Sequence, residues 1–472
     1  MPSLQRRANG ENLMTSIIKD FHRFVDDHKE EFIGDLFKFL KIKSISAQNV
    51  GMEECAHFLK NFMDECGIST RLLKLDGAFP ALYGEMLNPD AEKTLLIYGH
   101  YDVQPEDPIE LWDSDPFQPE IRDGKIFARG ATDDKGNLMA TLLALKTLLA
   151  VNDSLPINLK FFFEGEEEIG SPNMKTYMEE FQDLLAANYT ILCDRGIHES
   201  GRPQIYLGNK GITHADITVH GAKRDVHSGQ APLIPNAAWD LVRLLNKLKN
   251  DHDQILVDDY EVEVIKPSEE DLELLSKIPF DKQEFADTYG ISDVINGNAH
   301  KTHVDSLVQL LYQPTMTING LISGYQGSGN KTVIPNRATA KLDFRFVKIM
   351  DPAQSVERVK SYLSKVYQGK IDVKFGDVRN PSKVSPSADI VKTSIAAATE
   401  IYGSEPVVWP LLDGSGPMSL FEELLGAPAI IIGLGAPFAY ANTHAPNENI
   451  GIEDYLNGIK VMAYIYYLYG EG

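Results

Sequence analysis

The segment INLKFFFEGEEEIGS, residues 157–171, places an apolar run directly before a cluster of four carboxylates. The run from Ile157 to Phe163 has the length and the aromatic, apolar composition of a buried strand. Ligands of open parallel sheets gather at the carboxyl ends of the strands. The acidic residues that follow Phe163 therefore occupy the position in which a parallel sheet places its functional groups.

Three other apolar runs end in a similar way, each followed by a residue that can bind a metal: LLIY (95–98) by His100, YTILC (189–193) by Asp194, and AIIIGL (429–434) by a loop that carries His444. Longer helical patterns, such as DDKGNLMATLLALKTLLA (133–150), separate the runs. This alternation predicts an α/β fold in which helices flank a mainly parallel central sheet.

From about Gly211 the pattern changes to strict alternation of apolar and polar residues, as in GITHADITVHGA (211–222). Such alternation predicts antiparallel strands with one face open to water. The first pattern returns after Pro386. We therefore expect one domain made of residues 14–210 and 386–472, with a smaller α+β domain, residues 211–385, inserted into it.

The first amphipathic helical pattern begins just after Met14. Residues 1–13 are therefore expected to form a disordered leader, and Met14 is a candidate for the natural start. Arg6 and Arg7 precede polar residues instead of the apolar region of a signal peptide. No segment approaches the roughly 18 apolar residues of a membrane span, so no membrane partner is expected.

The charge of the chain opposes binding to nucleic acids and to anionic membranes. Lys and Arg number 45 against 68 Asp and Glu, which gives a net charge of −23. Small ligands and metal cations suit this balance better. The three cysteines contain no CxxC pair, which argues against a disulfide framework and a thiolate metal site and favours a cytoplasmic location.

Each acidic residue has a simpler interpretation when it is considered alone. Asp133 or Asp134 can cap a helix N-terminus, and EGEEE can be a solvated loop. Gathered at one sheet edge, however, these carboxylates would repel one another unless cations lie among them. Histidines and carboxylates without thiolates suit Zn²⁺, Mn²⁺ or Co²⁺. Since the carboxylates exceed the needs of one ion, we infer two ions bridged by one Asp.

Seven motifs, in this order, resemble those of the M20 metallopeptidases, in particular the carnosinase-like dipeptidases: GHYDVQP (99–105), ARGATDDKG (128–136), EGEEEIGS (164–171), DRG (194–196), DVHSG (225–229), TVIPN (332–336) and NTHAPNE (442–448). The resemblance spans almost the whole chain. It implies an enzyme that cleaves dipeptides or short peptides with a free C-terminal carboxylate through a metal-bridging hydroxide. It also implies that residues 211–385 form a lid and dimerisation domain of a homodimer.

The resemblance assigns the metal ligands as follows: His100 and Asp194 complete one ion, Glu168 and His444 complete the other, and Asp133 bridges both. Glu167 then acts as the general base. Asp102 lies two residues beyond His100 and fits a carboxylate that fixes the imidazole tautomer. Two divalent ions are expected in each subunit, with Zn²⁺ as the expected metal and Mn²⁺ or Co²⁺ as alternatives.

Four residues of the second domain and its surroundings match substrate-contacting positions of the family. His227 matches a histidine that stabilises the oxyanion and commonly reaches across a dimer interface, although alone it is a surface-loop residue. Arg345 matches the group that binds the substrate carboxylate, although alone it is a strand arginine. Thr332 and Ser415 match further substrate contacts.

One departure bears on specificity. Carnosinase-like enzymes have a further substrate-binding histidine after the second domain, whereas this chain has no histidine between His303 and His444. A preference for His-containing dipeptides is therefore not expected. Two alternatives stay open: an N-acyl-amino-acid deacylase of the aminoacylase or desuccinylase type, and a non-catalytic metal-binding relative, against which the presence of both Glu167 and Glu168 argues.

Overall fold

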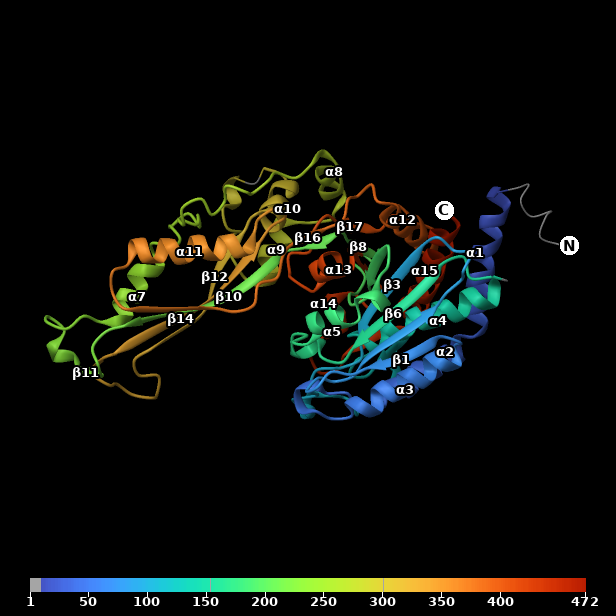
Figure 1. Cartoon of the computed structure of the whole chain (residues 1–472), viewed down its shortest axis with the longest axis horizontal. Coiled ribbons are helices and arrows are strands. Elements are labelled where there is room, and N and C mark those ends of the chain that lie inside the picture. Colours follow the sequence, from blue (N-terminus) through green and yellow to red (C-terminus); the bar gives the residue numbers. More distant parts are fainter. Residues whose placement is uncertain (1–9, 153, 300) are drawn as a thin grey trace. The chain divides into compact units, whose positions relative to one another are not determined.

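The computed structural model describes residues 10–152, 154–299 and 301–472 (Figure 1). The chain divides into two compact units. The first comprises residues up to Leu207 together with Val384–Trp409 and Leu420–Gly472, and the second comprises Gly208–Lys383 and Pro410–Ser419. The expected boundaries at 210 and 386 left residues 410–419 in the first domain. The structure assigns this segment to the second unit, where the Leu412 and Lys210 amides hydrogen-bond to Gly208 and Gly414 carbonyls.

The first unit contains an eight-stranded sheet. Its strands lie in the order β1 (Ser69–Leu73), β2 (Ala81–Met86), β6 (Asn158–Glu164), β3 (Thr94–His100), β7 (Tyr189–Leu192), β18 (Ala429–Gly433), β8 (Gln204–Tyr206) and β17 (Val407–Trp409). The central strands β6, β3, β7 and β18 are parallel neighbours. The prediction of a mainly parallel central sheet with flanking helices is confirmed.

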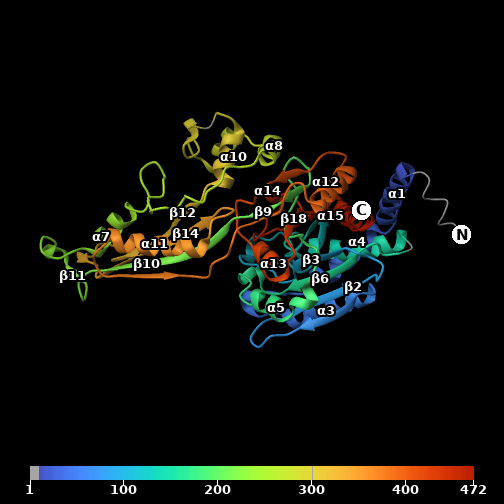
Figure 2. The same ribbon diagram turned by 45° about the horizontal axis from the view of Figure 1, so that its top comes forward.

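Helices cover this sheet, and the most deeply buried of them is α4 (Lys135–Val151). Because α4 is apolar around most of its circumference, it packs against both β3 and the C-terminal helix α15 (Ile452–Glu471), as Figure 2 shows. The other helices of this part of the chain are α1 (Gly10–Asp27), α2 (Lys29–Leu40), α3 (Met52–Glu65), α5 (Met174–Glu180), α6 (Gln182–Leu185), α12 (Asp389–Tyr402), α13 (Met418–Leu425) and α14 (Phe438–Ala441), with 3₁₀ turns η2 (Ser46–Gln48), η3 (Ile109–Leu111) and η4 (Glu167–Ile169).

A small antiparallel sheet accompanies the large one. It contains β4 (Glu120–Arg122), β5 (Lys125–Phe127) and β19 (Asn449–Gly451). The pairing of β19 with β5 brings the segment that follows His444 next to the segment that precedes Asp133. Two loops that are more than 300 residues apart in the sequence are thereby joined.

The predicted leader is wrong for its last four residues. Helix α1 begins at Gly10, not just after Met14, because Glu11, Leu13 and Met14 are helix formers that extend the pattern by a turn. Residues 1–9 lie outside the described residues.

The second unit contains an antiparallel sheet in the order β12 (Thr315–Ser323), β14 (Arg337–Phe346), β10 (Gly211–His220) and β15 (Ile371–Phe375). Helices α7 (Ala237–Leu245) and α11 (Pro352–Val366) pack on one face of this sheet (Figure 1). Ile217 and Leu342 of the sheet share a core with Leu244 and Val359 of the helices. Alternate residues of β10 and β14 are buried, as the sequence pattern predicted.

The remaining elements of the second unit are short. They are β9 (Gly208–Asn209), β16 (Ser382–Lys383), β11 (Val226–His227), β13 (Val333–Ile334), η5 (Ser228–Gln230), η6 (Gly297–Ala299) and the helices α8 (Glu269–Lys277), α9 (Lys282–Tyr289) and α10 (His303–Tyr312) of the 251–313 segment.

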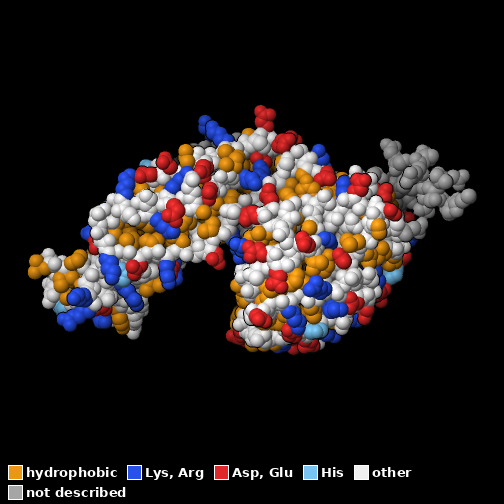
Figure 3. Space-filling view, in the orientation of Figure 1, with side chains coloured by type: hydrophobic (Ala, Val, Ile, Leu, Met, Phe, Trp, Pro, Cys, Tyr) orange, Lys and Arg blue, Asp and Glu red, His pale blue; other side chains and the backbone are white. Residues whose placement is uncertain are grey.

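The surface carries charges of both signs. On the face shown in Figure 3, Lys and Arg side chains are interspersed with Asp and Glu, so the net negative charge does not collect in one acidic patch on this face. Among the helices of the described residues, none combines the length and the apolar character that crossing a membrane requires.

Candidate metal centre

The acidic and histidine residues gather at the carboxyl edge of the parallel strands. His100 is the last residue of β3 and pairs with Glu164, the last residue of β6. Glu167 and Glu168 follow β6 in η4, and Asp194 lies two residues beyond the end of β7. Since β3 lies between β6 and β7, these side chains come from three adjacent strands.

A first group of possible ligands consists of His100, Asp133 and Asp194. The imidazole Nε2 of His100 lies 3.1 Å from Asp133 Oδ1 and 3.8 Å from Asp194 Oδ2. The His100 side chain is fully buried, so its ring has a fixed place between the two carboxylates. An ion at this point would receive one nitrogen and two oxygen ligands.

A second group consists of Asp133, Glu168 and His444. The imidazole Nε2 of His444 lies 2.9 Å from Asp133 Oδ2 and 3.1 Å from Glu168 Oε2. Asp133 thus offers Oδ1 to the first group and Oδ2 to the second. A carboxylate in this position can bridge two cations, which is the arrangement of two-metal hydrolytic sites.

Asp134 does not join either group. It occupies the N-cap position of α4, but its side chain makes no capping hydrogen bond. Instead, Asp134 Oδ2 accepts a hydrogen bond from the backbone N–H of His100 at 3.1 Å. Burial, reinforced by the nearby Asp194, raises the pKa of Asp134 well above its ordinary value. The simple interpretation of Asp134 as a helix cap is therefore wrong.

Asp102 connects His100 with the 3₁₀ turn η4, which contains Glu167 and Glu168. Its Oδ1 lies 3.3 Å from Nδ1 of His100, and the same nitrogen lies 3.0 Å from the Asp102 carbonyl oxygen. The carboxylate also accepts hydrogen bonds from the backbone N–H groups of Glu167 and Glu168, at 3.2 and 3.0 Å. Partners of this kind fix the tautomer and orientation of metal-binding histidines.

The pKa values show how strongly the cluster attracts positive charge. Burial, followed by the Asp133 carboxylate, raises the pKa of Asp194 to about 6. Burial raises the pKa of Glu167 to about 8; His100 opposes this rise, and Asp194 and other carboxylates add to it. Hydrogen bonds to Asp133 and Glu168 raise the pKa of His444 to about 10. The pKa of Asp133 is instead lowered despite its burial, because His100 and His444 hydrogen-bond to it. Carboxylates that either retain protons or pair with imidazoles in this way form a site suited to cations.

The donor atoms therefore fit divalent transition-metal ions. Each group supplies one imidazole nitrogen and carboxylate oxygens, a set that Zn²⁺, Mn²⁺ and Co²⁺ accept and that contains no thiolate. Glu167 interacts electrostatically with members of both groups but belongs to neither, so its carboxylate is free for another task.

The two other acids of the EGEEE segment have structural partners. Glu164 accepts hydrogen bonds from the hydroxyl groups of Tyr98 and Ser171, at 2.6 and 2.9 Å. Glu166 accepts from the backbone N–H of Phe79 and from the Asn173 amide, at 3.0 and 2.9 Å. Both hold the chain around the cluster.

The residues expected to contact substrate form two pairs within the second unit. His227 and Thr332 lie together, because the Ser228 N–H donates to the Thr332 carbonyl at 3.1 Å and β11 pairs with β13. Arg345 and Ser415 lie together, with Arg345 Nη1 donating to Ser415 Oγ at 2.8 Å. The first pair lies beyond the Arg337 end of β14, whereas Arg345 is near its other end.

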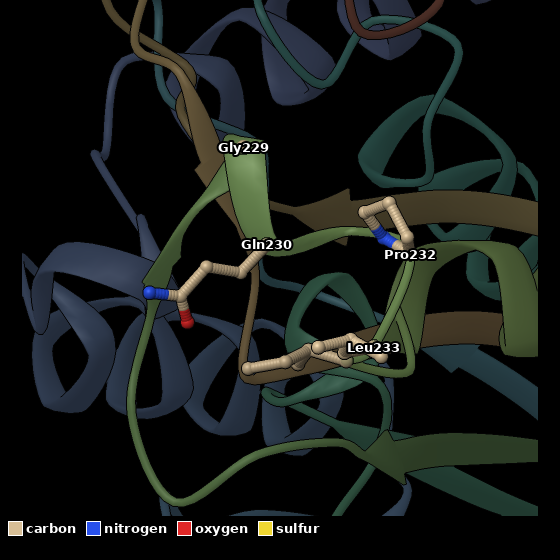
Figure 4. A pocket seen from close by; sticks show the side chains of 5 residues that line it. Gly229, Gln230, Pro232 and Leu233 are labelled. Atoms are coloured by element: carbon tan, nitrogen blue, oxygen red, sulfur yellow. The ribbon is translucent and has the colours of Figure 1, made fainter.

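The residues that follow His227 in the sequence line a pocket. Its volume is about 310 Å³, and it is lined by Gly229, Gln230, Pro232, Leu233 and Ile234. Figure 4 shows the Gln230, Pro232 and Leu233 side chains around it. His227 is exposed, and its Nδ1 accepts a hydrogen bond from the Gly229 N–H at 3.0 Å. The side chain is therefore available to a ligand or to another chain.

The chain belongs to the peptidase family M20/M25/M40, whose model matches residues 96–467. Among solved structures, it is similar to an M20 family metallo-carboxypeptidase, Sso-CP2, from Sulfolobus solfataricus: the TM-score is 0.84 and the identity 39%, over 94% of this chain and 100% of the other. Among curated proteins, it is 27% identical to a human Beta-Ala-His dipeptidase, over 95% of this chain and 92% of that protein. It is also 27% identical to the Cys-Gly metallodipeptidase dug1 of Schizosaccharomyces pombe, over 95% and 97% of the two chains.

Sequence reasoning missed three residues that lie around the possible ligands: Gln104, Arg129 and Glu448. Gln104 Nε2 donates to Glu168 Oε2 at 2.8 Å, and Arg129 pairs with Glu448. All three lie inside motifs that the sequence analysis singled out. The motif order identified the segments, but only the fold shows which side chains within them touch.

Proposed function

We propose that the protein is a two-metal peptidase that hydrolyses dipeptides and other short peptides with a free C-terminal carboxylate. The observation that carries this proposal is the Asp133 carboxylate, whose two oxygens face two separate histidine and carboxylate groups. The family membership and the relatives named as dipeptidases support it. We propose Zn²⁺ as the resident metal, with Mn²⁺ or Co²⁺ as alternatives, and a cytoplasmic location.

Bound divalent ions would supply Lewis-acid chemistry, lowering the pKa of a coordinated water and polarising the substrate carbonyl. His100, Asp133 and Asp194 would hold one ion, and Asp133, Glu168 and His444 the other. Glu167 is not needed as a ligand and lies next to both groups, so it can take the proton from water and return it to the leaving amine. Asp102 holds the Glu167 N–H and thereby fixes the start of η4.

Arg345 is proposed to bind the C-terminal carboxylate of the substrate. A guanidinium presents a planar fork of N–H donors that matches a carboxylate. One of its N–H groups is held by Ser415 Oγ, which orients the fork. Ser415 itself donates to the Gly211 carbonyl at 3.2 Å, so the pair is anchored to β10.

His227 is proposed to stabilise the oxyanion in the active site of a second copy of the chain. From Arg337 to Arg345, β14 advances by eight residues, which spans about 27 Å. A dipeptide is about 7 Å long. His227 and Arg345 of one chain therefore cannot contact the same dipeptide, and a homodimer formed through the second unit would supply the missing histidine.

The decisive experiment compares substrates on metal-stripped protein restored with Zn²⁺, Mn²⁺ or Co²⁺. Free dipeptides are expected to be the best substrates, and N-acetyl and N-succinyl amino acids poor ones. Rapid release of acetate or succinate with no cleavage of dipeptides would establish the deacylase instead. Metal binding without any hydrolysis would favour a non-catalytic relative.

A carboxypeptidase is a second candidate, because the similar Sulfolobus solfataricus structure carries that name at 39% identity. N-blocked dipeptides separate the two activities. A carboxypeptidase accepts a blocked amine, whereas a dipeptidase requires it free.

A further inference from the structure

A buried ion pair lies behind the candidate metal centre. Arg129 Nη1 donates to Glu448 Oε2 at 2.8 Å, and the two side chains are 1% and 0% exposed. Neither residue is among the possible ligands. A charge pair removed so completely from water is costly to build, and hydrogen bonds to its polar atoms offset that cost, although the buried Arg129 Nε has no hydrogen-bond partner. Its contacts therefore indicate what it holds.

The Glu448 carboxylate holds the loop that leads to Asp133. Its Oε1 accepts hydrogen bonds from the backbone N–H groups of Thr132 and Asp133, at 2.9 and 3.0 Å. Its Oε2 accepts from the Gly130 N–H at 2.9 Å as well as from Arg129. Four donors from five consecutive residues thus converge on one carboxylate.

The same pair reaches the two neighbouring loops. Arg129 Nη2 donates to the Pro105 carbonyl at 3.1 Å, in the loop that follows His100. Glu448 lies four residues after His444 and ends the loop that carries this histidine. His444 has φ +60°, a left-handed backbone conformation that is unfavourable for residues other than glycine. Such a conformation needs support from its surroundings.

We propose that the Arg129–Glu448 pair is the positioning device of the metal centre, which fixes the Asp133, His100 and His444 loops relative to one another. The inference rests on the proposed metal centre. Because Asp133 belongs to both ligand groups, the loss of its hydrogen bond to Glu448 would lower the affinity for both ions together. Removing a group that hydrogen-bonds to a metal ligand and holds it in place typically lowers metal affinity by about 10- to 100-fold.

The test measures binding of Mn²⁺ and Zn²⁺ to the metal-stripped full-length protein by competition with a chromophoric chelator. Glu448→Gln keeps the volume but removes the charge and places an N–H₂ group against N–H donors. It is expected to bind both ions about 10- to 100-fold more weakly, with an unchanged circular dichroism spectrum. Excess metal is expected to restore its hydrolysis, which it cannot do for Glu167→Gln.

Arg129→Lys provides a second variant in case Glu448→Gln does not fold. The lysine keeps the charge near Glu448 but cannot reach the Pro105 carbonyl at the same time. Arg129→Lys is expected to lower the affinity for both ions, as Glu448→Gln does.

Asp271→Asn is the matched control. Asp271 is also a buried carboxylate with a cationic partner, Lys383 Nζ at 2.5 Å, but it lies in the second unit. This variant is expected to lower the melting temperature and to leave metal affinity unchanged.

Three results would decide against the inference. Unchanged affinity for both ions in Glu448→Gln and Arg129→Lys would overturn it, and so would the loss of only one of the two ions. Wild-type protein that binds neither ion would remove the metal centre itself, and the inference with it.

Discussion

The distance between His227 and Arg345 can be tested for its functional meaning by a complementation experiment. The about 27 Å along β14 exceeds the about 7 Å length of a dipeptide, so in the proposed homodimer His227 would serve the active site of the other chain. Glu167→Gln removes the base of its own site, and His227→Ala removes the oxyanion donor of its partner's site. Each homodimer is expected to lose about 10²-fold or more in turnover.

Mixing the two variants should restore activity. In a heterodimer, the site with an intact Glu167 receives an intact His227, and the other site lacks both. An equal mixture after full subunit exchange contains half heterodimers with one working site each, so it should reach about a quarter of wild-type activity. The assay is dipeptide hydrolysis, with subunit exchange followed by mass-tagged chains.

The control mixes Glu167→Gln with His100→Ala. Each change disables the active site of its own chain, the first by removing the base and the second by removing a possible metal ligand, so no heterodimer has a working site and no recovery is expected. Failure of Glu167→Gln and His227→Ala to recover despite complete exchange would refute the shared site. Full activity of a monomeric wild-type chain would refute it equally.

Three further predictions concern single residues. Glu167→Gln is expected to reduce turnover by about 10²- to 10⁴-fold while metal content, measured by atomic emission, stays at the wild-type level; a fast variant would exclude this base. Gln104→Ala is expected to weaken only the ion held by Glu168 and His444, since Gln104 contacts Glu168; chelator competition that shows equal weakening of both ions would contradict this. Burial lowers the pKa of Lys210 to about 8, so between pH 8 and about 10.4 the unfolded chain binds more protons and stability rises with pH, by about 3 kcal/mol in total. The difference in unfolding free energy between wild type and Lys210→Met should follow this rise, and a flat difference would show that Lys210 keeps its charge in the fold.

The main sheet could be predicted because its strands carry two signals at once. In β6, an apolar run with strand length ends in the acidic cluster, and β3, β7 and β18 repeat the pattern with His100, Asp194 and the His444 loop. The parallel arrangement follows from the helices between these strands. The carboxyl edge then follows from chain direction alone.

Other features depend on contacts that no local pattern encodes. Residues 410–419 lie between segments of the first unit, yet their backbone pairs with Gly208 and Lys210 of the second. The partners of Glu448 are more than 300 positions away in the sequence, so its function is invisible until β19 pairs with β5. The start of helix α1 at Gly10 was not predicted, because its first residues lie before the amphipathic pattern on which the prediction depended.

The burial of α4 has a consequence for how the centre exchanges its ions. Asp133 precedes a helix whose side chains are enclosed along most of its length, so releasing it requires cooperative opening of the core. His444 lies on a surface loop, and its side chain is 54% exposed. Amide hydrogen exchange should therefore be slow along α4 and fast around His444, and in the proposed metal centre ions would enter and leave on the side of the His444 loop.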